Sequence, residues 1–133
     1  MANSVPESYL DLVTNKKVFA HLATLMPDGS PQVTPVWFDL EGDRIRVNSA
    51  KGRQKDRNMR RDPRVSICLM DPENPYRYVE LRGRVVEITE EGADAHIDSL
   101  GFKYLDAESY PFRKKDEIRV IYKIEIEHAQ GLR

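Results

Sequence analysis

The feature of this chain that most constrains its fold is an alternation of apolar and polar residues near the C-terminus. In residues 117–127, EIRVIYKIEIE, every second position from Ile118 to Ile126 is apolar. Successive side chains of a strand point to opposite faces of a sheet. This period of two therefore predicts a strand with one face turned toward a core.

Five further segments predict strands, because they are short, apolar and separated by turn signals. The six expected strands are residues 17–26, 30–40, 43–50, 64–71, 76–89 and 117–127. The turns PDGS and EGD between the first three predict an antiparallel meander over residues 17–50. Pro31 and Pro35 restrict the second strand to a sheet edge or a bulge, because proline has no N–H to donate. Gly83 predicts a bulge or bend in the fifth strand.

Three short helices are expected around these strands. They are predicted over residues 4–15, 52–61 and 89–104. Ser4 and Glu7 have the spacing of a capping box at the start of the first helix. Pro63 should end the second, because the residue before a proline disfavours the helical conformation. The third helix has an apolar stripe formed by Ala93, Ile97, Leu100 and Tyr104.

Six strands with little helix between them predict a mainly β fold, an antiparallel sheet closed into a barrel. The 133 residues fit a single domain, residues 1–133, with no internal repeat or low-complexity linker. Several strands are apolar on both faces, and aromatic residues such as Trp37, Phe38, Tyr76 and Tyr78 lie near expected turns. A barrel of this size cannot bury all of them within itself, so we expect a homodimer.

Charge and composition exclude several classes of protein. The formal net charge is -1, whereas general nucleic-acid binders have a strongly basic domain. No apolar run approaches the ~20 residues that span a bilayer. Residues 1–12 have no basic region followed by an apolar run, which a secretory signal would require. We therefore expect a cytoplasmic protein with neither nucleic-acid nor membrane partners.

The sequence contains none of the common catalytic motifs. It has no Walker loop, no Rossmann glycine fingerprint and no G-x-S-x-G elbow. His21, His96 and His128 lack metal-ligand spacing, so we expect no metal site and assign them to strand or helix structure. The single cysteine, Cys68, lies in an apolar strand and is expected to be a structural thiol. If the chain is an enzyme, its chemistry should belong to a cofactor.

Residues 48–64, NSAKGRQKDRNMRRDPR, contain a local excess of positive charge, with seven Lys or Arg and two acidic residues. Gly52 lies where a strand gives way to a helix, whose N-terminus offers unpaired N–H groups and the positive end of the helix dipole. Arg53 and Lys55 in that first turn are unfavourable until an anion binds. The stretch indicates either a phosphate site or a solvated basic helix face. A nucleic-acid site is less consistent with it, because no aromatic residues are interleaved.

Three segments together resemble a known family. ATL-x-PDGSPQ-x-TPVWF, GRQKDRN and NPYRYVELRGRV resemble the deazaflavin (coenzyme F-420)-dependent branch of the pyridoxamine 5'-phosphate oxidase-like flavin-binding split barrels. The similarity continues through EEGADAHIDSLGFKYL and RVIYKIEIEHAQGL, so it covers about residues 8–132. Each motif alone is weak, and their order and spacing make the resemblance specific.

The resemblance implies a six-stranded antiparallel split β-barrel that dimerises, with two cofactor sites between the protomers. It implies that Arg53 and Lys55 hold the phosphate of the cofactor. By the same resemblance, Asn48, Ser49, Ala50 and Gly52 line that loop, Val36 and Trp37 lie near the ring, and Tyr76 and Tyr78 come from the partner chain.

The implied activity is that of a reductase, in which reduced coenzyme F-420 transfers a hydride to an unsaturated small organic substrate. The alternatives are an FMN-dependent oxidoreductase of the same fold and a protein that binds a cofactor or haem without turnover. A basic loop accepts the phosphate of either cofactor, and the acidic tail of coenzyme F-420 could also meet Lys51, Arg57, Arg60 and Arg61. No residue is identified as catalytic. Substrate specificity is expected in loops 70–77 and 105–116.

Overall fold

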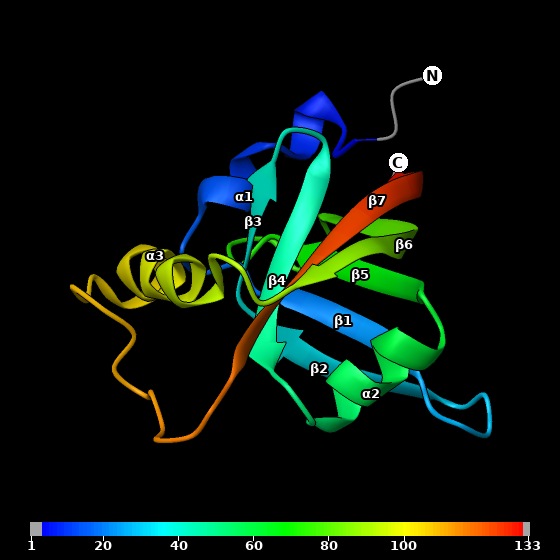
Figure 1. The fold of residues 1–133 in the computed structure, drawn as a ribbon. Coiled ribbons are helices and arrows are strands. Elements are labelled where there is room, and N and C mark those ends of the chain that lie inside the picture. The colour runs from blue at the N-terminus through cyan, green and yellow to red at the C-terminus, as the bar shows by residue number, and fades with distance from the viewer. Residues whose placement is uncertain (1–3, 132–133) are drawn as a thin grey trace.

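A computed structural model describes residues 4–131. Its seven strands form one antiparallel sheet in the order β2-β1-β5-β6-β7-β4-β3 (Figure 1). The strands are β1 (Ala20–Leu25), β2 (Pro31–Val36), β3 (Phe38–Glu41), β4 (Arg44–Ala50), β5 (Arg64–Met70), β6 (Tyr78–Thr89) and β7 (Arg119–Gly131). The helices are the 3-10 turn η1 (Glu7–Tyr9), α1 (Asp11–Thr14), α2 (Gln54–Arg61) and α3 (Ala93–Leu105). The prediction of a mainly β antiparallel fold is confirmed.

The predicted number of strands, six, is wrong: residues 4–131 contain seven. The segment expected as one strand over residues 30–40 is two strands, because its halves pair with different neighbours. β2 pairs with β1 and β3 pairs with β4, and the break falls at Trp37. There the Phe38 N–H donates to the Tyr104 hydroxyl, 3.3 Å away.

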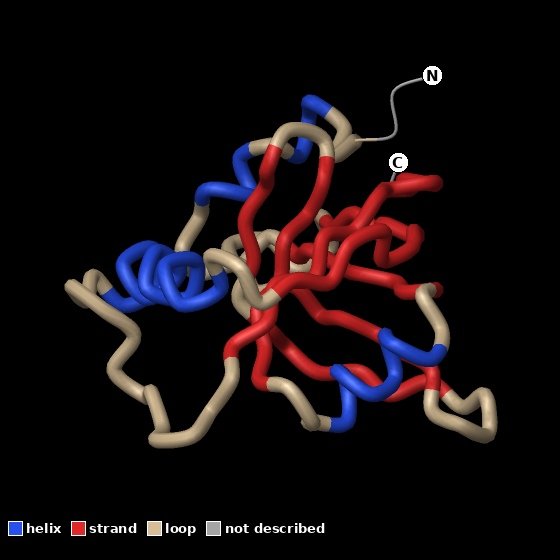
Figure 2. The backbone as a smooth tube through the Cα atoms, in the orientation of Figure 1, coloured by secondary structure: helices blue, strands red, loops and turns tan. Residues whose placement is uncertain are grey.

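The two edges of the sheet are therefore joined by a single residue of chain. β2 and β3 stand at opposite ends of the strand order but follow each other in sequence, which requires the sheet to curl (Figure 2). The edge position predicted for Pro31 and Pro35 is confirmed. Buried side chains fill the curled sheet, among them Leu22, Phe38, Ile67, Leu81, Tyr122 and Ile124. The result is a split barrel with an apolar interior.

The irregularity expected at Gly83 is present. The β6–β7 register shifts between Arg82 and Gly83. A Cβ atom on Gly83 would lie 2.0 Å from the Glu125 carbonyl oxygen, so only glycine fits this close approach of two backbones. The bulge lets the two longest strands bend together around the core.

The helices differ from expectation mainly at their N-termini. The capping box at Ser4 and Glu7 does not form: Pro6 is the N-cap of η1, with no side-chain capping bond. The third helix begins at Ala93 and not at residue 89, because β6 continues through Thr89 and Gly92 has a left-handed φ of 78°. Its predicted apolar stripe is buried, as expected. None of the helices within residues 4–131 is long and apolar enough to cross a membrane.

Candidate functional site

A cleft of about 190 Å³ lies beside the junction of β4 and α2. Six of the predicted site residues line it: Val36, Trp37, Asn48, Ser49, Arg53 and Lys55. Its other lining residues are Phe19, Pro35, Ile97, Tyr110, Phe112 and Arg119. The structure thus brings the predicted ring residues Val36 and Trp37, at and just after the end of β2, and the predicted phosphate residues of the β4–α2 turn to one cleft.

Four predicted site residues lie outside the lining of this cleft. Ala50 and Gly52 belong to the same strand-to-helix turn, where the Gly52 N–H is bonded to the Asp56 carboxylate at 2.8 Å. Tyr76 is 77% exposed, and Tyr78 lines a separate hollow on the outer face of the sheet. That the two tyrosines reach the site of a partner protomer stays a prediction.

Lys55 is a half-buried cation without a counterion. Its amine has no hydrogen-bond or ion-pair partner within residues 4–131. Burial lowers its pKa, and the positive charges of Arg53 and Arg119 lower that pKa further. A bound anion would remove both causes, because it would solvate the ammonium and offset the neighbouring charges.

Two arginines at the cleft share one carboxylate. Arg119 Nη1 lies 2.9 Å from Glu117 Oε1, and Arg53 Nη2 lies 3.3 Å from Glu117 Oε2. With Lys55, three cations and one anion give a local charge of 3 − 1 = +2. This surplus suits a phosphate, which has a charge of about −2 at neutral pH.

Ser49 provides an unsatisfied polar atom at the cleft. Its hydroxyl is buried and has no hydrogen-bond partner in the described part of the chain, and the residue is 2% exposed. A buried polar group without a partner costs about 1–3 kcal/mol, so such groups in native structures commonly await a ligand or an ordered water. Ser49 lines the same cleft as Lys55, so an anion bound there is a candidate partner for this hydroxyl.

The other cations of the basic stretch have partners within the chain. Lys51 pairs with Glu90 at 3.1 Å, and Arg60 pairs with the buried carboxylate of Asp56 at 2.9 Å. Arg61 donates to the Leu25 carbonyl at 2.6 Å, and Arg57 donates to the Gly52 carbonyl and to Gln54. Much of the charge run therefore stabilises α2 and the turn before it. The free positive charge is concentrated at Lys55.

Aromatic rings also line the cleft. Trp37 stacks on Tyr104 with ring centroids 5.2 Å apart and planes 7° apart. Tyr110 meets Trp37 edge-on at 5.9 Å and Phe112 at 5.8 Å. The Arg119 guanidinium lies 5.1 Å from the Tyr110 ring. A cleft lined by both aromatic rings and basic side chains suits a planar ligand that bears an anionic group.

The loop that supplies Tyr110 is fastened to α3. The Tyr110 N–H donates to Asp98 at 2.8 Å, and Arg113 bonds Asp98 at 2.5 Å and Asp94 at 3.0 Å. Because its anchors lie on a helix, the loop presents Tyr110 and Phe112 from a rigid base. The sequence indicated this loop as a specificity determinant but marked no residue in it.

Arg119 also escaped prediction from sequence. The alternation of residues 117–127 assigned it to the polar face of a strand, with no reason to place it near the basic stretch. The pairing of β4 with β7 sets Arg119 opposite Ala50 and so brings it to the cleft. Within residues 4–131 no three His, Cys, Asp or Glu side chains are grouped to hold a metal ion.

Several solved structures are similar to this chain. An F420 reductase is 36% identical, with a TM-score of 0.84 over 95% of this chain and 98% of that one. The conserved hypothetical protein Rv2991 from Mycobacterium tuberculosis is 27% identical, with a TM-score of 0.74 over 99% and 88% of the two chains. HupZ from Group A Streptococcus, at 19% identity and a TM-score of 0.70 over 96% and 94%, shares the fold.

The family comparison covers nearly the whole sequence. Residues 6–133 match the family described as pyridoxamine 5'-phosphate oxidase. The matched region includes the split barrel, the basic turn before α2 and the aromatic loop before β7. The chain therefore belongs to the pyridoxamine 5'-phosphate oxidase family.

Proposed function

We propose that this protein is a reductase that uses reduced coenzyme F-420. The observation on which this rests is the cleft itself, which is lined by the unpaired Lys55, by Ser49 with its unpartnered hydroxyl, and by aromatic side chains. Similarity to an F420 reductase at 36% identity over 95% of the chain supports this choice of cofactor.

The residues present fit such a cofactor. Lys55, Arg53 and Arg119 would hold its phosphate, with a hydrogen bond from Ser49, and the deazaflavin ring would lie against Val36 and Trp37. When bound, the reduced cofactor supplies a hydride to an unsaturated small organic substrate. The chain contributes binding and orientation, because Trp37 is held in place by its stacking on Tyr104. Tyr110 and Phe112 would shield the reacting face from water.

The proposed working unit is a cytoplasmic homodimer of single-domain protomers. The outer face of the sheet has a hollow of about 380 Å³, lined by Ala23, Val33 and Cys68 together with polar side chains that include His21, Glu80 and Gln130. Val33 is 64% exposed there. A second protomer on this face would cover these side chains and bring its Tyr76 and Tyr78 toward the cleft, as the resemblance implies.

FMN is the second candidate cofactor, and one observation favours it. Lys51, Arg60 and Arg61, which the acidic tail of coenzyme F-420 could meet, already have partners in the chain. The cleft needs only one phosphate to match its surplus charge. FMN has that phosphate and no acidic tail.

A binding screen distinguishes these functions. The purified apoprotein would be titrated with coenzyme F-420, FMN, FAD and haem, and binding followed by fluorescence or absorbance. We expect quenching of the deazaflavin fluorescence by a protein that is colourless as purified. A yellow preparation with a flavin spectrum, or preference for FMN in the titration, would favour the second candidate.

Turnover is tested separately from binding. Reduced coenzyme F-420 would be mixed with enones, quinones and other conjugated acceptors, and its oxidation followed with and without protein. Protein-dependent oxidation supports a reductase. Tight binding without oxidation by any acceptor would instead indicate a protein that only binds the cofactor.

A further inference from the structure

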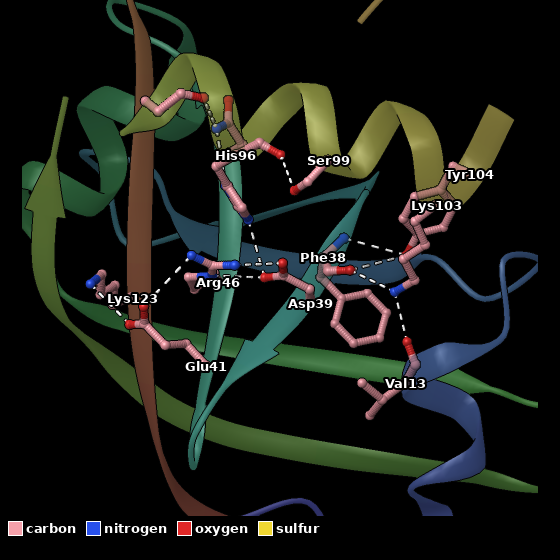
Figure 3. A network of polar contacts seen from close by, with 12 residues as sticks. Val13, Phe38, Asp39, Glu41, Arg46, His96, Ser99, Lys103, Tyr104 and Lys123 are labelled. Carbon is pink, nitrogen blue, oxygen red and sulfur yellow. Dashed lines mark hydrogen bonds and ion pairs between the residues drawn. The ribbon is translucent and has the colours of Figure 1, made fainter. Parts of the chain in front are cut away.

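A chain of hydrogen bonds between side chains links Asp39 on β3 to the cleft. His96 on α3 lies between Asp39 and Asn48: its Nε2 is 3.1 Å from Asp39 Oδ1, and its Nδ1 is 3.1 Å from Asn48 Nδ2. Asn48 Oδ1 in turn accepts from Arg119 Nε at 2.9 Å. Figure 3 shows His96 pointing from α3 toward Asp39 and Arg46. One end of this chain of hydrogen bonds is at Asp39 and the other is the guanidinium that lines the cleft.

The contacts of Asn48 fix the orientation of its amide. Its Nδ2 donates to the Ala93 carbonyl at 3.0 Å as well as to His96, and its oxygen accepts from Arg119. Both N–H groups and the oxygen are thus used. Reversing the amide would face the oxygen toward the Ala93 carbonyl and the NH2 group toward the Arg119 N–H, so only one orientation satisfies all three neighbours.

That orientation also fixes the tautomer of His96. Because Asn48 donates to Nδ1, this nitrogen must be an acceptor, and the ring proton must lie on Nε2 and donate to Asp39. Arg46 holds the Asp39 carboxylate with two bonds of 2.9 and 2.7 Å. Burial raises the pKa of Asp39, but the hydrogen bonds from His96 and Arg46 outweigh it and lower that pKa overall. Asp39 is therefore a carboxylate at neutral pH and a suitable acceptor.

We propose that His96 is a positioning residue for the anion site, acting on Arg119 through Asn48. His96 does not line the cleft and its side chain is 1% exposed, so it cannot touch a ligand. Together with the Ala93 carbonyl, it holds Asn48 in the one orientation that leaves the oxygen free for Arg119 Nε. The guanidinium is then aimed by Asn48 on one side and Glu117 on the other, at 2.9 Å from each. This inference rests on the proposed function, because it assumes that the cleft binds the cofactor phosphate.

Four variants test the proposal: His96→Leu, His96→Gln, Arg119→Gln and the double variant His96→Leu with Arg119→Gln. Leucine removes both ring hydrogen bonds, whereas glutamine retains one acceptor and one donor. We expect His96→Leu to weaken coenzyme F-420 about fivefold, the effect of one lost hydrogen bond. His96→Gln should restore most of that loss. In the Arg119→Gln background, His96→Leu should have no further effect, because the residue through which it acts is gone.

The binding results distinguish a role of His96 in orienting Arg119 from a general role of His96 in stabilising the fold. Equal weakening by His96→Leu with and without Arg119 would overturn the proposal, as would failure of His96→Gln to restore affinity while it folds normally by circular dichroism. If His96→Leu does not fold, the nitrogen shifts of the wild-type imidazole decide: a proton on Nδ1 overturns the assignment, and a proton on Nε2 supports it.

A measurement without ligand keeps this test independent of the proposed function. The Arg119 Nε–H resonance, identified by its loss in Arg119→Gln, should exchange slowly with water in the wild-type apoprotein. It should exchange faster in His96→Leu and slowly again in His96→Gln. If coenzyme F-420 fails to bind the wild type, the proposed function fails, yet these exchange rates still show whether His96 positions Arg119. Unchanged exchange in His96→Leu would overturn the proposal.

Discussion

Lys55 combines burial, like-charged neighbours and the lack of a counterion in the described structure. The other cations of the basic stretch have partners within the chain, so replacing one of them removes a structural contact. Arg60, for example, neutralises the buried Asp56 carboxylate, whereas Lys55 neutralises nothing. Replacing Lys55, and separately a cation that already has a partner, therefore distinguishes ligand binding at the site from an effect of surface charge.

Lys55→Ala should weaken binding of the phosphate-bearing cofactor by about 10- to 100-fold, because a charge-assisted hydrogen bond contributes about 1.5–3 kcal/mol. Lys51→Ala is the matched control, since Lys51 is exposed, pairs with Glu90 and does not line the cleft. Isothermal titration of both variants with coenzyme F-420 and with FMN measures the effect. Similar losses in the two variants would mean that overall charge, and not the site, controls binding.

At the residue scale, the sequence pointed to those cleft-lining residues that lie close together in the chain. Arg53 and Lys55 were found because strand, glycine and helix follow one another along the chain. Arg119 and Tyr110 were missed because strand pairing and ring packing bring them to the cleft from distant parts of the sequence. His96 was assigned a structural role because its partners, Asp39 and Asn48, lie on other elements.

At the scale of secondary-structure elements, Lys103 joins α3 to α1 and β3. Its Nζ donates to the Val13 carbonyl at 2.6 Å and to the Phe38 carbonyl at 2.7 Å (Figure 3). The amine also lies 4.4 Å from the Phe38 ring centroid and 4.7 Å from that of Tyr104. Both carbonyl bonds can persist after deprotonation, because a neutral amine still has two N–H groups.

Stability should depend on the titration of Lys103. Burial lowers its pKa from 10.5 to about 8, against the opposing charge of Asp39. Between these values the unfolded chain binds more protons, so the free energy of unfolding should rise with pH. Urea unfolding of the wild type and Lys103→Met, between about pH 8 and 9.5, measures this difference, with Lys16→Met as the control. A wild-type advantage over Lys103→Met that stays constant with pH would contradict the prediction.

Gly83→Ala should destabilise the β6–β7 pair by about 3 kcal/mol, because its Cβ overlaps a backbone carbonyl that cannot move without breaking the ladder. Gly42→Ala is the control: its site is open, and only the positive φ of 61° opposes a side chain. That change should cost about 1 kcal/mol. Thermal unfolding compares the two, and an equal loss of stability would show that the close approach at Gly83 is readily relieved.

The elements themselves were largely predictable, and the division at Trp37 was not. Period-two patterns and turn residues located the β segments, because those signals are local. Residues 30–40 form one uninterrupted extended pattern in sequence, and nothing in that pattern shows that its halves have different partners. Only the three-dimensional pairing, with Tyr104 accepting from the Phe38 N–H, reveals two strands.

At the scale of the whole molecule, the proposed dimer makes oligomeric state and cofactor binding depend on each other. Val33→Arg, on the outer sheet face at 64% exposed, should convert a dimer to a monomer and abolish cofactor binding. Phe102→Arg is the control, since Phe102 is 66% exposed on α3, away from that face. Analytical ultracentrifugation with cofactor titration tests both. Full binding by a monomeric Val33→Arg would show that one protomer contains a complete site.

The division at Trp37 also bears on the order in which the molecule assembles. β1 with β2 and β3 with β4 are hairpins with short turns, and isolated hairpins form in about 1–10 μs. β1 with β5 and β4 with β7 join segments far apart in sequence, which slows their pairing. We therefore expect the two hairpins that flank Trp37, one of which contains Ser49, to form early, and Arg119 to reach them only when the last strand docks.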